Sequence, residues 1–250
     1  MLTDVQLAKS LATLAGETLV ALRNQQPTDN RIRSAKTLGD EGDSLANDFL
    51  IESLRRERPH DAILSEESVD DFARLGAARV WIIDPLDGTR EYREGRDDWA
   101  VHVALVERGV VTAASVSLPA QSLVFASDDA MHPASATANA ERAHRIVVSR
   151  SRPPEFTQRV ASAIGARIDT VGSAGAKAMC VVRGEAAAYL HDGGMNEWDA
   201  AAPVGVALAY GLAVCDLQGQ TITFNHRDVV LRDGLILCRP EFKAAILNAL

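Results

Sequence analysis

Two aspartates, Asp84 and Asp87, are the residues of this sequence best suited by type and spacing to bind a metal. They follow the run Val80 to Ile83, whose β-branched and aromatic residues are typical of a buried strand. Asp84-Pro85 is predicted to end that strand, because proline has no N–H to donate to a ladder. Pro85 restricts the turn, so both carboxylates can face one side with the carbonyl of Leu86 between them. These oxygens are typical ligands of a hard divalent cation such as Mg²⁺.

The next residues are suited to binding an anion. Gly88 lets the backbone approach a ligand closely, and a short helix beginning at Thr89 would point free N–H groups toward a phosphate. A metal and a phosphate would then be neighbours. The alternative is an Asp-Pro turn followed by an Asp-Gly turn, which occurs on many protein surfaces without a function.

Three further carboxylates stand at the ends of predicted elements. Glu66 follows the short apolar strand 62–64, Asp199 is the expected N-cap of an apolar helix over 200–210, and Asp43 is the expected N-cap of a helix that stops at Pro59. Like charges that share one cleft repel each other, and they escape this by protonation or by binding cations. An acidic surface turn at Glu66 and a purely structural cap at Asp43 are the alternatives.

Two stretches resemble the signatures of one enzyme family. Residues Trp81 to Tyr92 resemble the first signature of the inositol monophosphatase superfamily of Mg²⁺-dependent, Li⁺-sensitive phosphatases. Residues Trp198 to Gly211, which begin Trp-Asp-Ala-Ala-Ala-Pro, resemble its second signature, and the two occur in the expected order. Ser65-Glu66-Glu67 and the stretch Gly172 to Lys177 extend the resemblance, which covers most of the chain from about Asp43 to Gly211.

The resemblance implies a fold, a reaction and a set of metal ligands. The fold would be α/β, a layered α-β-α-β-α sandwich, and the reaction would be attack on phosphorus by a metal-activated water. Two or three Mg²⁺ ions are expected, with Asp84 bridging two of them. The implied ligands are Glu66, Asp84, the Leu86 carbonyl, Asp87 and Asp199.

The resemblance also implies how the remaining site residues act. Thr89 and Asp43 would relieve the attacking water of its proton, and the backbone N–H groups of Gly88 and Thr89 would hold phosphate oxygens. A cytoplasmic enzyme acting on a small phosphate ester, in sulfate assimilation or nucleotide recycling, is the expected setting.

Three details resemble the branch of 3′(2′),5′-bisphosphate nucleotidases, which hydrolyse 3′-phosphoadenosine 5′-phosphate. They are Arg90-Glu91, Ser149-Arg150-Ser151 and Lys177, so the predicted substrate contacts are Arg90, Ser149, Arg150 and Lys177. Lys177 and Arg150 are the candidates for the second phosphate, unless Lys177 lies on the outer face of its helix and meets only solvent. Arg152 departs from the histidine that this branch often has. Inositol monophosphatase activity, fructose-1,6-bisphosphatase activity and a non-catalytic regulator that binds metal or phosphate are the alternatives.

Composition limits the class of protein. The chain has 250 residues, of which 47% are hydrophobic, enough for one large domain or two joined lobes. A net charge of −8 argues against binding a nucleic-acid polymer, and a homodimer is left open. The three cysteines lack metal-ligand spacing, which indicates reduced thiols and a cytoplasmic location. No secretory signal or membrane span is expected.

The elements needed to position these residues can be predicted in outline. Thr3 and Gln6 have the spacing of a capping box, which begins a helix ending near Asn24, and residues 27–42 are predicted to be a mobile loop. The runs 99–107, 110–118 and 123–126 predict a β-meander, in which His102 is interpreted as a core or interface histidine rather than a metal ligand.

The second half of the sequence predicts another α/β unit. A strand at 145–148 and a helix over 153–164 begin it, a helix that starts in the stretch 172–177 follows, and a hairpin is predicted from 212–217 and 221–224. We expect an N-terminal lobe, residues 1–127, with the metal motifs, and a C-terminal lobe, residues 143–250, that contributes Asp199. The junction at about 127–143 joins them into one compact unit.

Overall fold

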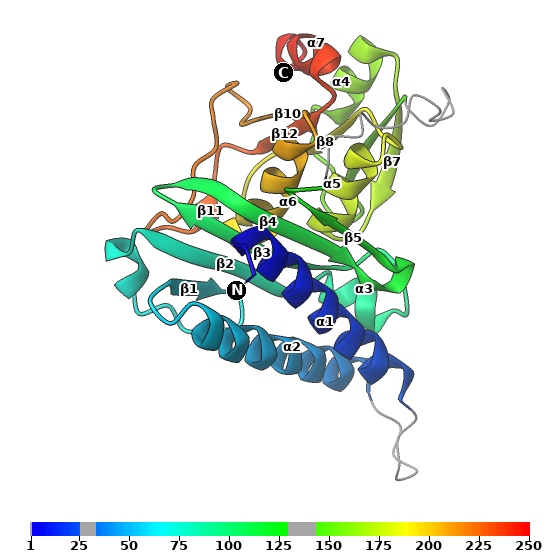
Figure 1. The fold of residues 1–250 in the computed structure, drawn as a ribbon. Coiled ribbons are helices and arrows are strands. Elements are labelled where there is room, and N and C mark those ends of the chain that lie inside the picture. The colour runs from blue at the N-terminus through cyan, green and yellow to red at the C-terminus, as the bar shows by residue number, and fades with distance from the viewer. Residues whose placement is uncertain (1, 26–33, 130–143) are drawn as a thin grey trace.

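A computed structural model of the chain describes residues 2–25, 34–129 and 144–250, and in it two five-stranded sheets alternate with layers of helices (Figure 1). The first sheet has the order β1-β2-β3-β4-β5. β1 runs parallel to β2, and the other neighbours are antiparallel, which confirms the predicted meander. Its strands are β1 (Ala62–Ser65), β2 (Arg79–Asp87), β3 (Ala100–Glu107), β4 (Val110–Leu118) and β5 (Leu123–Ala126).

The second sheet has the order β10-β12-β8-β6-β7 and is built from the C-terminal half of the chain. Its central strand β8 pairs with β6 in parallel and with β12 in antiparallel orientation. A separate two-stranded sheet joins β9 to β11. The strands are β6 (Arg145–Ser149), β7 (Arg167–Val171), β8 (Ala188–His191), β9 (Met195–Asn196), β10 (Ala213–Cys215), β11 (Val230–Leu231) and β12 (Leu235–Cys238).

Helices fill the three layers around these sheets (Figure 1). Side chains alternate along β2, so Trp81 and Ile83 pack against α1 and α2, whereas Val80 and Ile82 face α5 and α6 in the middle layer. The outer face of the second sheet packs against α4 and α7. The predicted layered α-β-α-β-α sandwich is therefore confirmed. The helices are α1 (Asp4–Asn24), α2 (Ala35–Glu57), α3 (Thr89–Arg93), α4 (Thr157–Ile164), α5 (Ala174–Val182), α6 (Glu197–Ala209) and α7 (Lys243–Asn248), with 3₁₀ turns η1 (Ala73–Gly76), η2 (Pro119–Gln121) and η3 (Pro240–Phe242).

The N-terminal caps of the first two helices can be compared with the predicted ones. Thr3 forms the predicted capping box with Gln6, and α1 ends at Asn24. The start predicted for the second helix is wrong, because Ser34 caps α2 by accepting the N–H of Thr37 at 3.0 Å. Residues 35–42 are thus helical rather than a loop, and residues 27–33 of that predicted loop lie outside the described residues.

Three other predictions need correction. The strand β2 does not end at Asp84-Pro85 but continues to Asp87 through an irregularity in its pairing with β3. The helix predicted over 153–164 begins only at Thr157. The predicted hairpin of residues 212–224 does not form, because β10 pairs with β12 and residues 221–224 are not in a strand. In the two strand cases long-range pairing outweighed the local pattern.

The boundary predicted between two lobes stays a prediction, since residues 130–143 lie outside the described part. Helices α5 and α6 from the C-terminal half pack against β3 and β4 of the first sheet. Within the described ranges, no helix combines the length and the apolar character needed to cross a membrane.

Candidate active site

The bulge at the end of β2 turns two aspartates toward the same place. Asp84 lies opposite His102 of β3, and Asp87 lies opposite Ala100, so three steps along β2 match two along β3. Leu86 N–H donates to Asp84 Oδ1 at 3.1 Å, which holds that carboxylate against the backbone. Both aspartates are buried; a regular strand would place positions 84 and 87 on opposite faces, whereas the bulge lets both carboxylates face the same site.

Asp199 and Glu66 complete an acidic cluster. Carboxylate oxygens of Asp84, Asp87 and Asp199 lie within 4.8 Å of one another. Asp199 is not the N-cap predicted for it: Asn196 caps α6, and Asp199 Oδ2 accepts the Asn196 N–H at 2.7 Å. Glu66 follows β1 and its N–H donates to the Ile83 carbonyl, so the parallel pairing of β1 with β2 brings it beside Asp84 as expected.

The donor atoms of this cluster fit a divalent cation. Asp84 Oδ2 is buried and has no hydrogen-bond donor among the described residues. A buried carboxylate oxygen without a donor loses its hydration with no compensation, and a cation would supply that compensation. All ligand groups here are hard oxygens, which favours Mg²⁺ over softer metals.

Crowding raises the proton affinity of most of these groups. Burial and the charges of Glu66, Asp87 and Asp199 raise the pKa of Asp84 well above its usual range. Burial and Asp199 raise the pKa of Glu66 to about 7, and burial and Asp87 raise the pKa of Asp199 to about 6. Without a cation, the cluster therefore tends to hold protons near neutral pH.

Asp87 differs because hydrogen-bond donors surround it. Its Oδ1 accepts the N–H of Ala174 at 3.2 Å, and its Oδ2 accepts the N–H of Gly175 at 2.6 Å, both from the start of α5. The Nε2 atom of His102 lies 3.1 Å from Oδ2. Burial alone would raise the pKa of Asp87, but His102 and these N–H groups lower it below its ordinary value.

Asp43 and Thr89 meet as the resemblance implied. Thr89 is the first residue of α3, and its Oγ1 lies 3.4 Å from Asp43 Oδ1 and 3.2 Å from the Leu86 carbonyl oxygen. Asp43 stands in the body of α2, where the absent side chain of Gly42 lets the helix approach: a Cβ there would lie 3.3 Å from Leu86. Burial, with Glu67 and Glu66 nearby, raises the pKa of Asp43 to about 7.

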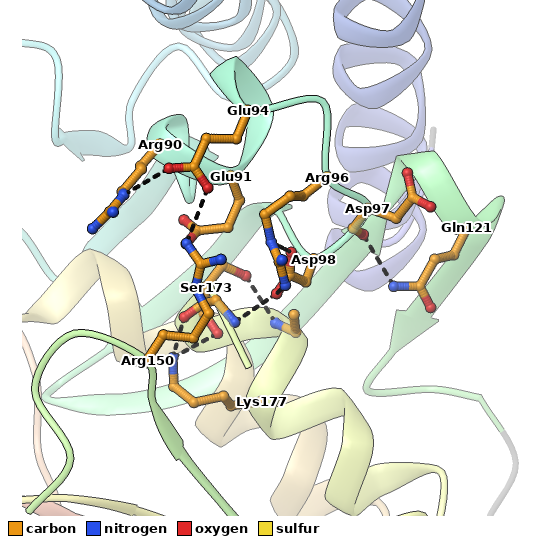
Figure 2. Close-up of polar contacts among 12 residues, drawn as sticks. Arg90, Glu91, Glu94, Arg96, Asp97, Asp98, Gln121, Arg150, Ser173 and Lys177 are labelled. Carbon is orange, nitrogen blue, oxygen red and sulfur yellow. Dashed lines mark hydrogen bonds and ion pairs between the residues drawn. The ribbon is translucent and has the colours of Figure 1, made fainter. Parts of the chain in front are cut away.

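The two predicted substrate arginines share an acidic partner, Glu94, at the C-terminal end of α3 (Figure 2). Arg150 donates to Glu91 Oε1 at 2.9 Å and to Glu94 Oε2 at 3.1 Å, and Arg90 donates to Glu94 Oε1 at 3.0 Å. Arg150 therefore lies against the helix that begins at Thr89. Ser149, at the end of β6, contacts Ser151 and the Arg152 N–H, so its hydroxyl shapes the turn that carries Arg150.

Lys177 points inward from α5 (Figure 2), and the solvent-facing alternative is wrong. Its side chain is buried, and its ammonium donates to the carbonyls of Gly172 and Ser173, with the ring of Tyr189 nearby. Burial lowers the pKa of Lys177, although Asp87 and Glu91 oppose this. Two of its three N–H groups are thus used to hold the loop before α5.

Sequence reasoning missed two partners of these residues. His102 is a buried histidine as predicted, but it contacts Asp87, and Glu91 pairs with Arg150 across 59 positions of sequence. The one local signal was the placement of His102 between Ala100 and Ala104 on the inward face of β3, where small neighbours leave room for a ring.

The raised pKa values predict how stability depends on pH in the absence of metal. A carboxyl whose pKa is higher in the folded protein keeps its proton longer than in the unfolded chain, so unfolding becomes easier as pH rises through that interval. Asp43, Glu66 and Asp199 place the interval between about pH 4 and about pH 7. Thermal melts in chelator should therefore give a Tm that is several degrees lower at about pH 7.5 than at about pH 5. A loss of about 1 kcal/mol in the free energy of unfolding lowers Tm by about 2–4 °C for a protein of this size.

Added Mg²⁺ should remove most of this fall, because the cation replaces the protons. The variant Asp43→Asn, in which one raised group no longer titrates, should show a smaller fall than the wild type in chelator. A Tm that stays level or rises over the same pH interval would contradict the inference that crowding raises the pKa values of these carboxyl groups.

The sequence is similar to sequences of known proteins. A model of the inositol monophosphatase family matches residues 2–250. The chain is 45% identical to a protein of Mycobacterium leprae named 3′-phosphoadenosine 5′-phosphate phosphatase, over 100% of this chain and 94% of that protein. It is 47% identical to the protein of that name from Mycobacterium bovis, over 86% of this chain and 82% of the relative.

One solved structure has the same arrangement of elements. CysQ from Bacteroides thetaiotaomicron, described as a bacterial member of the inositol monophosphatase family, matches with a TM-score of 0.78. Identity is 23%, and the match covers 94% of this chain and 97% of that one. At this identity the likeness concerns the fold.

Proposed function

Because the chain belongs to the inositol monophosphatase family, we propose that it is a Mg²⁺-dependent phosphatase that hydrolyses 3′-phosphoadenosine 5′-phosphate to AMP and inorganic phosphate. The observation that carries this is the 45% identity to a phosphatase of that name over the whole length of the chain. The convergence of Asp84, Asp87 and Asp199 supports a reaction that uses a divalent cation.

The residues that would hold the cations are those predicted from the sequence: Glu66, Asp84, the Leu86 carbonyl, Asp87 and Asp199. Bound Mg²⁺ would act as a Lewis acid on the phosphate and lower the pKa of water. The burial of Asp84 and Asp87 keeps bulk water away from the inner side of the cluster, whereas Glu66 lies at its rim, exposed as a residue although its carboxyl group is desolvated. Substrate would therefore enter from the side of Glu66.

Thr89 and Asp43 would manage the proton of the attacking water. The Thr89 hydroxyl lies between Asp43 and the Leu86 carbonyl, so it can accept a proton while it passes its own to Asp43. A pKa of about 7 makes Asp43 a suitable acceptor at neutral pH. Gly88 and Thr89, at the turn before α3, are the proposed backbone contacts of the reacting phosphate.

For the second phosphate we propose Arg150 as the main contact, with Ser149 and Arg90 beside it. Arg150 is half-buried next to α3 and offers a charged donor close to the turn at Gly88. Lys177 would act mainly through the Gly172–Ser173 loop that it holds. A cytoplasmic location and a homodimer stay predictions.

A phosphate-release assay tests the proposal. Purified protein with Mg²⁺ is given 3′-phosphoadenosine 5′-phosphate, inositol 1-phosphate and fructose 1,6-bisphosphate, and parallel reactions contain chelator. We expect the highest kcat/KM for the nucleotide and no release in chelator. A preference for inositol 1-phosphate or the sugar bisphosphate would replace the nucleotidase by those alternatives, and no release from any substrate would favour a non-catalytic regulator.

A further inference from the structure

His102 occupies the space between the two segments that carry metal-site aspartates. It lies on β3 directly opposite Asp84, and its side chain has no exposed surface. The end of β2, the start of α5 and the start of α6 surround it.

The two ring nitrogens of His102 contact different segments. Nε2 lies 3.1 Å from Asp87 Oδ2, and Nδ1 lies 3.0 Å from the carbonyl oxygen of Trp198. Trp198 directly precedes Asp199, so the ring spans from one carboxylate to the backbone beside another. Nδ1 makes a hydrogen bond to the Trp198 carbonyl, whereas Nε2 makes a close ion-pair contact with Asp87 that lacks hydrogen-bond geometry.

Gly175 closes the space around this ring. A Cβ at Gly175 would lie 2.3 Å from His102 Nε2 and 3.2 Å from Asp87 Oδ2, so only glycine allows α5 to approach this closely. The approach gives Asp87 the N–H groups of Ala174 and Gly175. Asp87 is thus held by two backbone donors at the start of α5 and by the adjacent ring of His102.

We propose that His102 is a positioning residue, which sets the orientation of Asp87 and its separation from Asp199 for cation binding. The inference rests on the proposed metal site and extends it to a residue that binds no metal itself. Neighbours that orient the ligands of a metal typically change its affinity when they are replaced, by about 10- to 100-fold. Without the ring, Asp87 keeps only its backbone donors, and the start of α6 loses its tie to β3.

The test measures metal binding rather than turnover. Titration calorimetry of substrate-free protein with Mg²⁺ is done on the wild type, on His102→Phe, which keeps a ring but no donor, and on His102→Gln, which keeps an amide donor. We expect Kd to rise by about 10- to 100-fold for His102→Phe and by less for His102→Gln. Val160→Ala, in the outer core of the second sheet, is the control for a general loss of stability.

The outcomes separate the role of His102 from the existence of the site. If the folded variants bind Mg²⁺ as the wild type does, or if Val160→Ala weakens binding equally, His102 has only a packing role. If the wild type itself binds no Mg²⁺, the proposed metal site fails instead. Should His102→Phe not fold, His102→Gln decides: an unchanged Kd for it overturns the proposal.

Discussion

Asp84→Asn is expected to remove nearly all phosphatase activity while the protein stays folded. The change keeps the volume of the side chain but takes away the negative charge and the buried oxygen Oδ2, which has no donor in the described structure. Asp84 is also the proposed bridge between two cations, so both would be affected. Steady-state rates with 3′-phosphoadenosine 5′-phosphate at saturating Mg²⁺ should show kcat reduced by about 100-fold or more, which is at least about 2.7 kcal/mol of barrier.

A matched control separates this loss from a general effect of the substitution. Asp48→Asn changes the same residue type on the exposed face of α2 and should keep wild-type rates. Retention of more than about a few per cent of kcat in Asp84→Asn would exclude the two-metal assignment.

The same variant should behave in the opposite way when stability is measured without metal. Burial and three neighbouring carboxylates raise the pKa of Asp84, which means that its charge opposes folding at neutral pH. Asp84→Asn removes that charge. In chelator it should melt at or above the wild-type temperature, and clearly lower melting would mean that the carboxylates are better separated than their positions indicate.

The sequence was sufficient for the parts of the site that follow from strand ends. Glu66 comes directly after an apolar strand, and Asp84 and Asp87 lie at the end of the neighbouring one, so their meeting at one edge of the sheet could be expected. The sandwich was implied by the resemblance to the family, and the predicted meander and second α/β unit fit two sheets layered between helices. These features depend on local pattern together with few possible topologies.

The predictions that were wrong concern features that depend on long-range packing. Residues 35–42 contain two glycines and several polar residues, which locally favour a loop, yet Gly42 packs against Leu86 and the segment is helical. The continuation of β2 through Pro85 depends on pairing with β3 across a bulge. The contact of Asp43 with Thr89 was implied by the resemblance, whereas the helix start predicted at Asp43 was wrong.

The contacts of charged side chains were even harder to predict from the sequence. Nothing near Arg150 in the sequence indicates Glu91, and nothing near Lys177 indicates that its ammonium turns back to the carbonyls of its own loop. Such contacts depend on how the second sheet is placed against α3. Because the Lys177 ammonium is engaged by its own loop, our proposal takes Arg150 rather than Lys177 as the second-phosphate contact.

Arg150→Gln should then discriminate between two nucleotides that differ only in the phosphate which does not react. With 3′-phosphoadenosine 5′-phosphate, loss of a charge-assisted hydrogen bond costs about 1.5–3 kcal/mol, so kcat/KM should fall by about 10- to 150-fold. With 3′-AMP, which has the same reacting phosphate and no 5′-phosphate, it should change little. Arg152→Gln, an exposed arginine on the same turn, is the matched control.

The comparison of the two nucleotides shows whether Arg150 binds the second phosphate or stabilises α3. Arg150 also neutralises Glu91, which is buried beside the turn at Gly88, so its loss could disturb α3 and the reacting phosphate. That disturbance would lower kcat/KM for both nucleotides by the same factor, because both place the same phosphate at the metals. An equal fall would therefore make Arg150 a support of α3, and no fall for either would remove it from the site. Only a loss confined to the bisphosphate matches a direct contact with the second phosphate.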